Sequence, residues 1–282
     1  MGLEVFKYAT KEVYIAEEGQ NVEQAICIMD VNGFRRLPVV KDKKFVGMIT
    51  FRDIMREFAK GVSEDVEKGK SSFAKLFLEI PLTEIMTPEF ISISIISTVD
   101  EASKIMVEQN IGCLPVFIDE KRSLGGIITE RDVVSSVAEL PVEEKVQDYM
   151  TKNVITVNEK TNLFDCLKLM VESNIRRMPI VNDEGTLTGL ITASGILKYL
   201  NNPETIKGLK EGNYEKVLHK QVNEIMTKTL ITVNSEVSVK EAAAKMHDKG
   251  IGCLLVMENS KLAGIITERD LLKVAMQSLT KK

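Results

Sequence analysis

One stretch decides how this chain folds: Gly126-Ile127-Ile128-Thr129-Glu130-Arg131-Asp132. An apolar run short enough for one strand stops at a threonine. A segment with helical periodicity follows, with an aspartate three residues after the threonine. The phrase returns at residues 264–270 and, in looser form, at 47–53 and 189–195. Four copies in 282 residues indicate a repeat protein, in which each copy belongs to one supersecondary unit.

The Thr-x-x-Asp part of the phrase has two explanations. A threonine followed three residues later by an acid resembles a capping box, and an acid in a first helical turn is favoured by the helix dipole. In the copy at 189–195, however, Gly195 takes the place of the acid, and residues 196–200 still read as helix. If the aspartate served only to begin the helix, its loss in this copy would be a defect. An aspartate that held a ligand would leave a weaker or empty site.

Composition predicts a soluble globular protein with about two domains of ordinary size. Hydrophobic residues make up 44% of the chain and charged residues 28%, and the net charge is −4. That charge supplies no basic field for nucleic acid. No apolar run approaches the roughly 18 residues that span a membrane. The first residues lack a signal-peptide pattern. A cytoplasmic location without a membrane partner is therefore expected.

Catalysis and metal binding find little support in the sequence. The four cysteines are scattered singly, which favours buried or pocket-lining thiols over a disulfide framework. The two histidines, His219 and His247, have no ligand-like spacing. No nucleophile–base pair and no cofactor fingerprint is present, so we expect a protein that is not an enzyme and carries neither metal nor cofactor.

Each repeat reads as β-α-β-β-α. In the first, a strand around Val13–Ile15 precedes an amphipathic helix with Val22, Ala25, Ile26 and Met29 on one face. Strands at 34–40 and 45–50 flank a turn at 41–44, and a helix runs from 51 to about 60. The predicted repeats cover residues 1–60, 81–140, 141–200 and 221–282. The intervening residues 61–80 and 201–220 are expected to be polar connectors, the first containing at most a short extra helix.

Alternate repeats are the most alike. Repeats one and three share Arg-Arg before Leu/Met-Pro, whereas repeats two and four share Ile-Gly-Cys-Leu and Ile-Ile-Thr-Glu-Arg-Asp. Arg35 and Arg176 are 141 residues apart, and Cys113 and Cys253 are 140 apart. A consecutive pair was therefore duplicated and is predicted to be the structural unit. One three-stranded sheet with two helices cannot bury both faces alone, so two repeats are expected to share a core.

At these residues the sequence closely resembles the CBS-domain family, whose repeats pair into Bateman modules. Four repeats in one chain are similar to the gamma subunits of AMP-activated protein kinase and their stand-alone archaeal relatives. The resemblance implies an α/β (α+β) fold of four CBS repeats in two Bateman modules that form a flat, pseudo-symmetric disc. It also implies regulatory, energy-sensing binding of AMP, ADP or ATP, with a regulated protein as partner, and it is compatible with a homodimer.

The chemistry of the phrase suits a nucleotide. A carboxylate accepts both hydroxyls of a ribose, and the threonine and free amides at the same helix start can hold phosphate. Guanidinium groups match phosphate geometry. The resemblance therefore gives this ribose and phosphate set: Thr50, Asp53, Thr129, Asp132, Thr192, Thr267 and Asp270, with Arg35, Arg36, Arg52, Arg131, Arg176, Arg177 and Arg269 as cations. Paired arginines at a strand start would equally be expected as solvated side chains.

The resemblance also places the adenine of each site between the first strand and the middle strand of the partner repeat, that is, the repeat that does not supply the aspartate. It assigns Tyr14 and Phe34 to the site of Asp132, Ile91 and Ile111 with its neighbour Gly112 to Asp53, Ile155 and Ile175 to Asp270, and Ile231 and Ile251 to the repeat that lacks an aspartate. Apolar residues at these positions are equally expected of a core.

Three other functions remain open. Sensing of S-adenosylmethionine or methylthioadenosine would leave the Arg-Arg pairs without a phosphate. Nucleic-acid binding is disfavoured by the acidic balance and by an aromatic content of 5% without tryptophan. An enzyme with an unrecognised site would reveal itself by turnover of ATP.

Overall fold

The computed structural model describes residues 4–68, 73–88, 90–137 and 144–280. The chain divides into two compact units built from interleaved segments. The first unit contains Met1–Val13, Phe90–Val154 and Ile231–Lys282, and the second contains Tyr14–Glu89 and Ile155–Leu230. The boundary predicted between residues 140 and 141 lies outside the described residues. Each unit is described below by itself.

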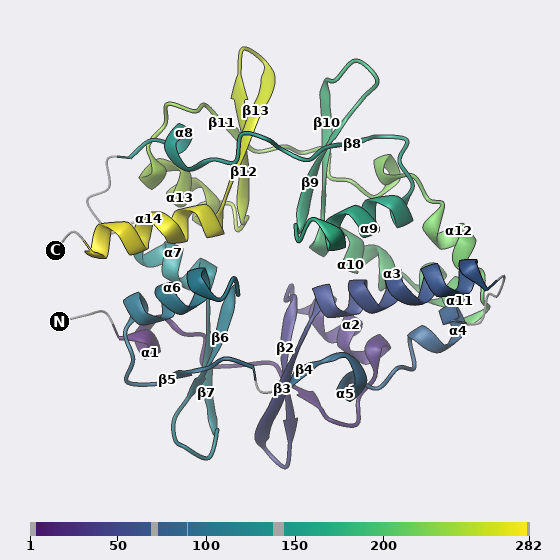
Figure 1. The fold of residues 1–282 in the computed structure, drawn as a ribbon, viewed down its shortest axis with the longest axis horizontal. Helices are drawn as coiled ribbons and strands as arrows, with labels where there is room; N and C mark the ends of the chain where they lie inside the picture. Colours follow the sequence, from purple (N-terminus) through teal and green to yellow (C-terminus); the bar gives the residue numbers. More distant parts are fainter. Residues whose placement is uncertain (1–3, 69–72, 89, 138–143, 281–282) are drawn as a thin grey trace. The chain divides into compact units, whose positions relative to one another are not determined.

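The second unit holds most of repeats one and three (Figure 1). Its elements within Tyr14–Glu89 are β1 (Ala16–Glu17), α2 (Val22–Val31), β2 (Arg36–Lys41), β3 (Lys44–Thr50), α3 (Phe51–Glu67), α4 (Phe73–Phe77), α5 (Leu82–Ile85) and β4 (Thr87–Pro88). Its elements within Ile155–Leu230 are β8 (Val157–Asn158), α9 (Leu163–Glu172), β9 (Arg177–Val181), β10 (Leu187–Thr192), α10 (Ala193–Leu200), α11 (Pro203–Lys210), α12 (Tyr214–Leu218) and a 3₁₀ turn at Val222–Glu224.

The first unit holds most of repeats two and four. Its elements are α1 (Val5–Tyr8), β5 (Ile93–Ser94), α6 (Val99–Glu108), β6 (Cys113–Phe117), β7 (Leu124–Thr129), α7 (Glu130–Val137), α8 (Val146–Tyr149), β11 (Thr232–Val233), α13 (Val239–Asp248), β12 (Cys253–Glu258), β13 (Lys261–Thr267) and α14 (Glu268–Thr280).

The predicted β-α-β-β-α order is present in all four repeats. In each, the short first strand pairs in parallel with the middle strand, and the middle and third strands form an antiparallel hairpin. In the first hairpin, Asp42 and Lys43 have φ angles of 48° and 63°, the left-handed backbone that a two-residue turn requires. The first strand was misplaced: β1 begins at Ala16, because Ala16 and not the exposed Tyr14 faces the core.

Two hydrophobic cores form, and each joins alternate repeats. In the second unit, α2 and α3 pack against α10 and α9; in the first, α6 and α7 pack against α14 and α13 (Figure 1). The prediction that two repeats share a core is confirmed, but consecutive repeats were expected to share it. Helical periodicity identifies the face that is buried. It does not identify the helices that cover that face, so it could not show which repeat shares the core.

Consecutive repeats are connected instead through their opening segments. Thr87 in the Met-Thr opening of repeat two pairs with Met48 and adds β4 to the sheet of repeat one. Thr10, in the opening segment of repeat one, exchanges two 2.9 Å backbone hydrogen bonds with Ile127 of repeat two. Repeats three and four do the same with two further pairs, Leu190 with Thr227 and Ile265 with Thr151. These exchanges explain why the two compact units interleave along the chain.

The glycine of the recurring phrase makes room for this crossing backbone. A Cβ atom on Gly126 would lie 2.8 Å from the carbonyl oxygen of Thr10, and one on Gly47 would lie 2.9 Å from that of Thr87. Contacts this short force the backbone to move, so only glycine permits the approach. The glycine is thus a packing requirement of the opening segment.

We expect Gly126→Ala to lower the free energy of unfolding by about 1–3 kcal/mol, because the methyl group must displace the backbone at Thr10. The matched control is Gly19→Ala, where a Cβ meets nothing within 4 Å. The control should change stability by no more than about 0.5 kcal/mol. Urea unfolding of both variants checks this, and equal stability of the two would contradict the packing role.

The connectors are more ordered and more buried than predicted. Helix α3 continues to Glu67, and Phe58 on it packs against Phe73 and Phe77 of α4 with ring centroids 6.5 Å and 4.6 Å away. In the other connector, Leu209 of α11 is buried, as are Val217 and Leu218 of α12. The polar composition of both segments misled the prediction, because a few apolar residues at helical spacing are enough to dock a short helix.

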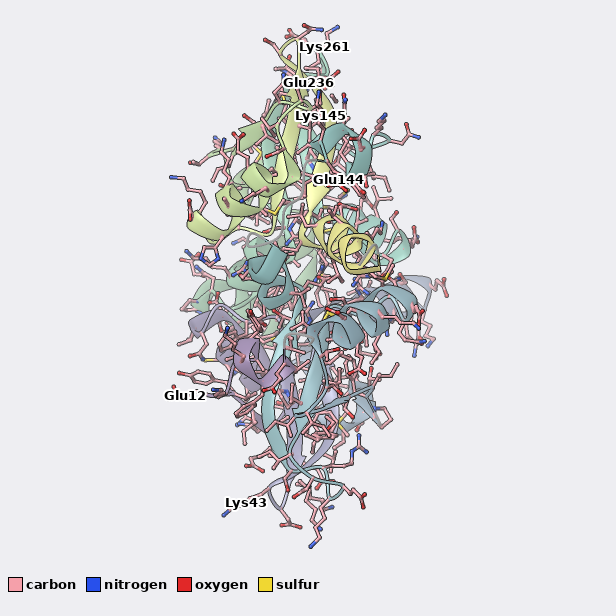
Figure 2. The ribbon with its side chains drawn as sticks, turned by 90° about the vertical axis from the view of Figure 1, so that its left-hand side faces the viewer. Glu12, Lys43, Glu144, Lys145, Glu236 and Lys261 are labelled. Carbon is pink, nitrogen blue, oxygen red and sulfur yellow. The ribbon has the colours of Figure 1, made fainter. Side chains whose placement is uncertain are left out.

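Figure 2 shows how the opening of repeat three joins repeat four in the first unit. The amide of Val239, at the start of α13, donates to the carbonyl oxygen of Glu144 at 2.8 Å. Beside it, Lys145 forms an ion pair with Glu236. Within the described ranges, none of the helices is both long and apolar enough to cross a lipid bilayer.

Candidate functional site

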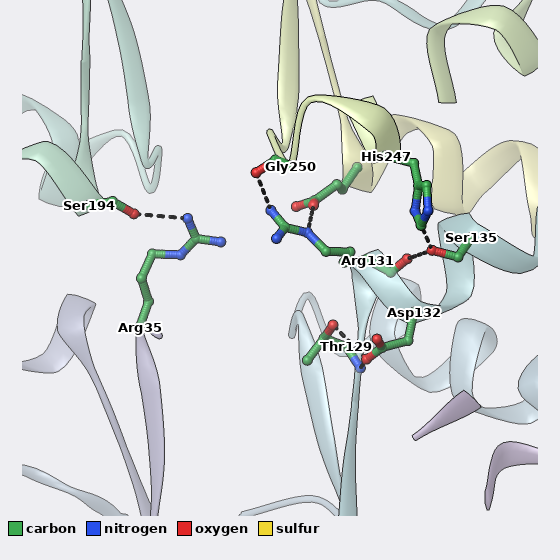
Figure 3. Close-up of polar contacts among 9 residues, drawn as sticks. Arg35, Thr129, Arg131, Asp132, Ser135, Ser194, His247 and Gly250 are labelled. Carbon is green, nitrogen blue, oxygen red and sulfur yellow. Dashed lines mark hydrogen bonds and ion pairs between the residues drawn. The ribbon is translucent and has the colours of Figure 1, made fainter. Parts of the chain in front are cut away.

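The threonine and aspartate of the phrase form one local structure in three repeats. Oδ2 of Asp132 accepts hydrogen bonds from the backbone N–H and the hydroxyl of Thr129, both at 2.8 Å (Figure 3). The equivalent distances are 2.9 and 2.5 Å for Asp53 with Thr50, and 2.9 and 2.7 Å for Asp270 with Thr267. The capping arrangement is therefore present, and it occupies one oxygen of each carboxylate.

The other oxygen, Oδ1, differs between the three. It lies 3.3 Å from the guanidinium of Arg56 in Asp53 and 3.6 Å from the ammonium of Lys273 in Asp270. In the described part of the chain, no cation or donor reaches Oδ1 of Asp132. Burial raises the pKa of Asp132 above its ordinary value, although the hydrogen bonds from Thr129 oppose this. Oδ1 of Asp132 is thus available to a ligand hydroxyl.

The fourth repeat copy shows that the helix start does not need the acid. The hydroxyl of Thr192 accepts a 3.0 Å hydrogen bond from the N–H of Gly195, and α10 begins at Ala193 as the other helices begin after their threonines. Threonine alone therefore caps this helix.

The predicted arginine pairs lie beside the threonines in the second unit. Strand register places Arg36 opposite Thr50 and Arg177 opposite Thr192. Arg35 donates to the hydroxyl of Ser194 at 3.1 Å (Figure 3), which joins repeat one to the helix start of repeat three. Arg35, Arg36, Arg176 and Arg177 are all half-buried. In the first unit, Gly-Cys pairs occupy these positions, so Arg35 and Arg176 correspond to Gly112 and Gly252.

Two of the predicted phosphate cations are engaged in a reciprocal pair of ion bridges in the first unit. Nε of Arg131 lies 2.9 Å from Glu268, and Nε of Arg269 lies 2.6 Å from Glu130. The side chain of Glu130 is 2% exposed and that of Glu268 is 5% exposed. Each glutamate is the first residue of its helix, so the bridges tie α7 and α14 together at their N-termini.

The sequence interpretation missed both glutamates, although a signal was present. Glu130 and Glu268 occupy the same position in repeats two and four, where repeats one and three have Phe51 and Ala193. In repeats two and four the residue after the threonine is charged, whereas in repeats one and three it is apolar. This difference between alternate repeats was the signal. Arg52, the third arginine of this kind, lies in the second unit on α3. The phosphate role of all three remains a prediction.

The residues predicted for adenine fall into an exposed group and a group that packs against the cores. Tyr14, Phe34, Ile91 and Ile155 are 52%, 37%, 42% and 39% exposed. Ile111, Ile175, Ile231 and Ile251 are partly buried at the rims of the two cores. Tyr14 and Phe34 lie together in the second unit, with ring centroids 5.4 Å apart. The resemblance pairs these adenine residues with aspartates that belong to the other unit of the chain. That pairing stays a prediction.

Titratable groups elsewhere offer little chemistry. Cys113, Cys166 and Cys253 are buried as expected, but Cys27 is exposed. Burial raises the pKa of Cys166 to about 12, so its thiol is not reactive. Among the described residues, no cluster of histidine, cysteine and carboxylate side chains could hold a metal ion.

The sequence matches the CBS domain at residues 5–60, 82–139, 146–202 and 222–277. These four ranges cover most of the chain and coincide with the four structural repeats. The chain belongs to the CBS-domain family. All four CBS repeats carry the threonine of the recurring phrase, and three of them carry the aspartate.

Two archaeal proteins resemble this chain over most of their length. The uncharacterised protein MJ1225 of Methanocaldococcus jannaschii is 32% identical over 97% of this chain and 99% of its own. Its crystal structure, described as that of a proposed archaeal homologue of γ-AMPK, has a TM-score of 0.87 and covers 96% of this chain and 99% of that one. A protein from the ribosomal RNA operon of Thermofilum pendens is 31% identical, over 92% of this chain and 86% of its own.

Proposed function

We propose that this CBS protein is a regulatory adenine-nucleotide binding protein that senses AMP, ADP or ATP and does not catalyse their turnover. The observation that carries the proposal is the half-occupied carboxylate. In each of three repeats, the threonine holds Oδ2 and so fixes the side chain, while Oδ1 takes no part in the cap. Oδ1 contacts a flexible surface cation in Asp53 and Asp270, and no cation among the described residues in Asp132. A fixed carboxylate with an available oxygen suits the vicinal hydroxyls of ribose.

Two further observations support a phosphorylated adenosyl ligand. The exposed Tyr14–Phe34 pair has the apolar character that an adenine ring needs, and it was not used to build the core. The half-buried arginines at the starts of β2 and β9 supply positive charge next to threonines at helix N-termini. A ligand without phosphate would make no use of this positive charge. The resemblance to the proposed γ-AMPK homologue agrees with this choice.

Calorimetric titration with AMP, ADP, ATP and S-adenosylmethionine tests the proposal. We expect the three nucleotides to bind with at most three strong equivalents, because the repeat with Gly195 lacks the ribose carboxylate. Preferential binding of S-adenosylmethionine, with nucleotides excluded, would contradict the proposal. A phosphate-release assay with ATP should detect no turnover.

Restoring the missing acid should create a fourth strong site. A Cβ on Gly195 would lie 3.4 Å from the hydroxyl of Thr192 and 3.9 Å from the carbonyl oxygen of Ile225, which are ordinary contacts. We expect Gly195→Asp to add one equivalent of AMP binding. An acid in the first helical turn should also stabilise the fold by about 0.3–1 kcal/mol. Gly195→Asn is the control, because it adds the same bulk without the charge and should add no strong equivalent.

A further inference from the structure

The residue three positions after each aspartate distinguishes the three carboxylates. This position lies one helical turn further along the same helix face and carries Arg56 in repeat one, Ser135 in repeat two and Lys273 in repeat four. Repeat three has Lys198 there, after Gly195. Repeat two is thus the copy in which a cation is replaced by a neutral hydroxyl.

The cations contact the oxygen that a ribose would use. Arg56 and Lys273 reach Oδ1 of Asp53 and Asp270, whereas the threonine bonds occupy Oδ2. A ribose hydroxyl that binds Oδ1 must therefore share or displace the cation. When an uncharged nucleoside displaces the cation from Oδ1, it offers the cation no negative group in return. A nucleotide brings a phosphate that can engage the displaced guanidinium or ammonium group.

Asp132 has a different charge environment. The hydroxyl of Ser135 donates to the carbonyl oxygen of Arg131 at 3.0 Å and lies 3.4 Å from Nδ1 of His247 (Figure 3). The guanidinium of Arg131 is bound by Glu268. Arg131, the cation adjacent to Asp132 in sequence, is therefore paired with a glutamate, and Oδ1 of Asp132 accepts a hydroxyl without displacing a cation.

We propose that the residue three positions after the aspartate selects the adenosyl ligand by charge. Resting on the proposed function, the inference is that Asp53 and Asp270, with Arg56 and Lys273, take phosphorylated adenosines. Asp132, with Ser135, takes uncharged or cationic adenosyl compounds as readily as phosphorylated ones. One chain then binds two classes of ligand. The first class is adenine nucleotides, whose phosphate is needed for strong binding, and the second is adenosyl compounds that bind with or without phosphate.

Single-site proteins test this selection. Asp132→Asn with Asp270→Asn leaves Asp53, and Asp53→Asn with Asp270→Asn leaves Asp132. Affinities for AMP and adenosine are measured by calorimetry at about pH 8, where ordinary histidines are uncharged. The quantity of interest is the ratio of the two affinities. We expect this ratio to be about three- to tenfold larger at Asp53 than at Asp132, the range that a partly exposed charge contact gives.

Two charge exchanges then move the ratio in opposite directions. Arg56→Met in the Asp53 protein should lower the AMP-to-adenosine ratio about three- to tenfold, and Ser135→Arg in the Asp132 protein should raise it by a similar factor. Lys44→Met removes one positive charge at the far end of β3 and is the control, which should leave the ratio unchanged. Circular dichroism verifies that each variant is folded.

The outcomes separate the inference from the proposed function. If AMP and adenosine bind but neither Arg56→Met nor Ser135→Arg moves their ratio, the inference is overturned and the proposed function stands. If neither ligand binds any single-site protein, the proposed function falls and the inference with it. Opposite shifts in the two variants, with the control unchanged, would support the inference.

Discussion

Asp132→Asn is expected to weaken AMP and ATP binding at that residue at least tenfold and to leave the stability of the fold nearly unchanged. Asparagine keeps an oxygen that can accept the two hydrogen bonds of Thr129, so the helix start is preserved. The charge that strengthens the ribose contact is lost, and charge-assisted hydrogen bonds contribute roughly 1.5–3 kcal/mol. Calorimetry and thermal unfolding measure the two effects separately.

The shifted pKa of Asp132 fixes the sign of the stability change. Because burial raises this pKa, folding favours the protonated carboxyl group. Its contribution to stability is fully present below the ordinary pKa and is lost as the pH rises through the raised pKa. At neutral pH, the asparagine variant should therefore be as stable as the wild type or slightly more stable. A variant that unfolds early and binds nucleotides normally would reduce Asp132 to a helix cap.

Arg35→Ala is the companion control for phosphate. It should weaken AMP and ATP binding and spare adenosine, and the loss should shrink at high salt because screening weakens charge contacts. Together, the two variants assign sugar and phosphate to different residues.

Phe58→Ala should lower the free energy of unfolding by about 3–5 kcal/mol, the largest stability effect that we expect for a single residue. Phe58 is 1% exposed and packs on Phe77 of α4, so truncation leaves a cavity between a repeat helix and the connector. Urea unfolding followed by circular dichroism measures the loss.

Leu76→Ala on the same connector helix is the matched control. Leu76 is 59% exposed, so its loss should change stability by no more than about 0.5 kcal/mol. A cost below about 1 kcal/mol for Phe58→Ala would show that α4 is not part of the core.

The repeat architecture could be predicted because its signals are local. The recurring phrase, the 140-residue offset and the helix faces, such as Leu163, Cys166, Leu167 and Met170 of α9, lie within short windows, and the structure buries all four of these residues. The hairpin turn at Asp42 and Lys43 is local for the same reason.

The partners of these elements could not be predicted, because they are set by contacts between distant residues. Nothing near Gly126 in sequence indicates that the backbone at Thr10 crosses it. Likewise, the bridge from Arg131 to Glu268 spans 137 residues, so Arg131 resembled a free phosphate ligand. Of the two Thr-x-x-Asp explanations, the structure shows the cap in three repeats, and the ligand role stays a prediction.

A crystal structure with AMP bound tests the central claim most directly. The account predicts ribose hydroxyl oxygens within about 3.2 Å of the carboxylate oxygens of Asp53, Asp132 or Asp270, and weak or no density at the repeat with Gly195. AMP ordered elsewhere, with all three aspartates bonded only to their own threonines, would contradict it.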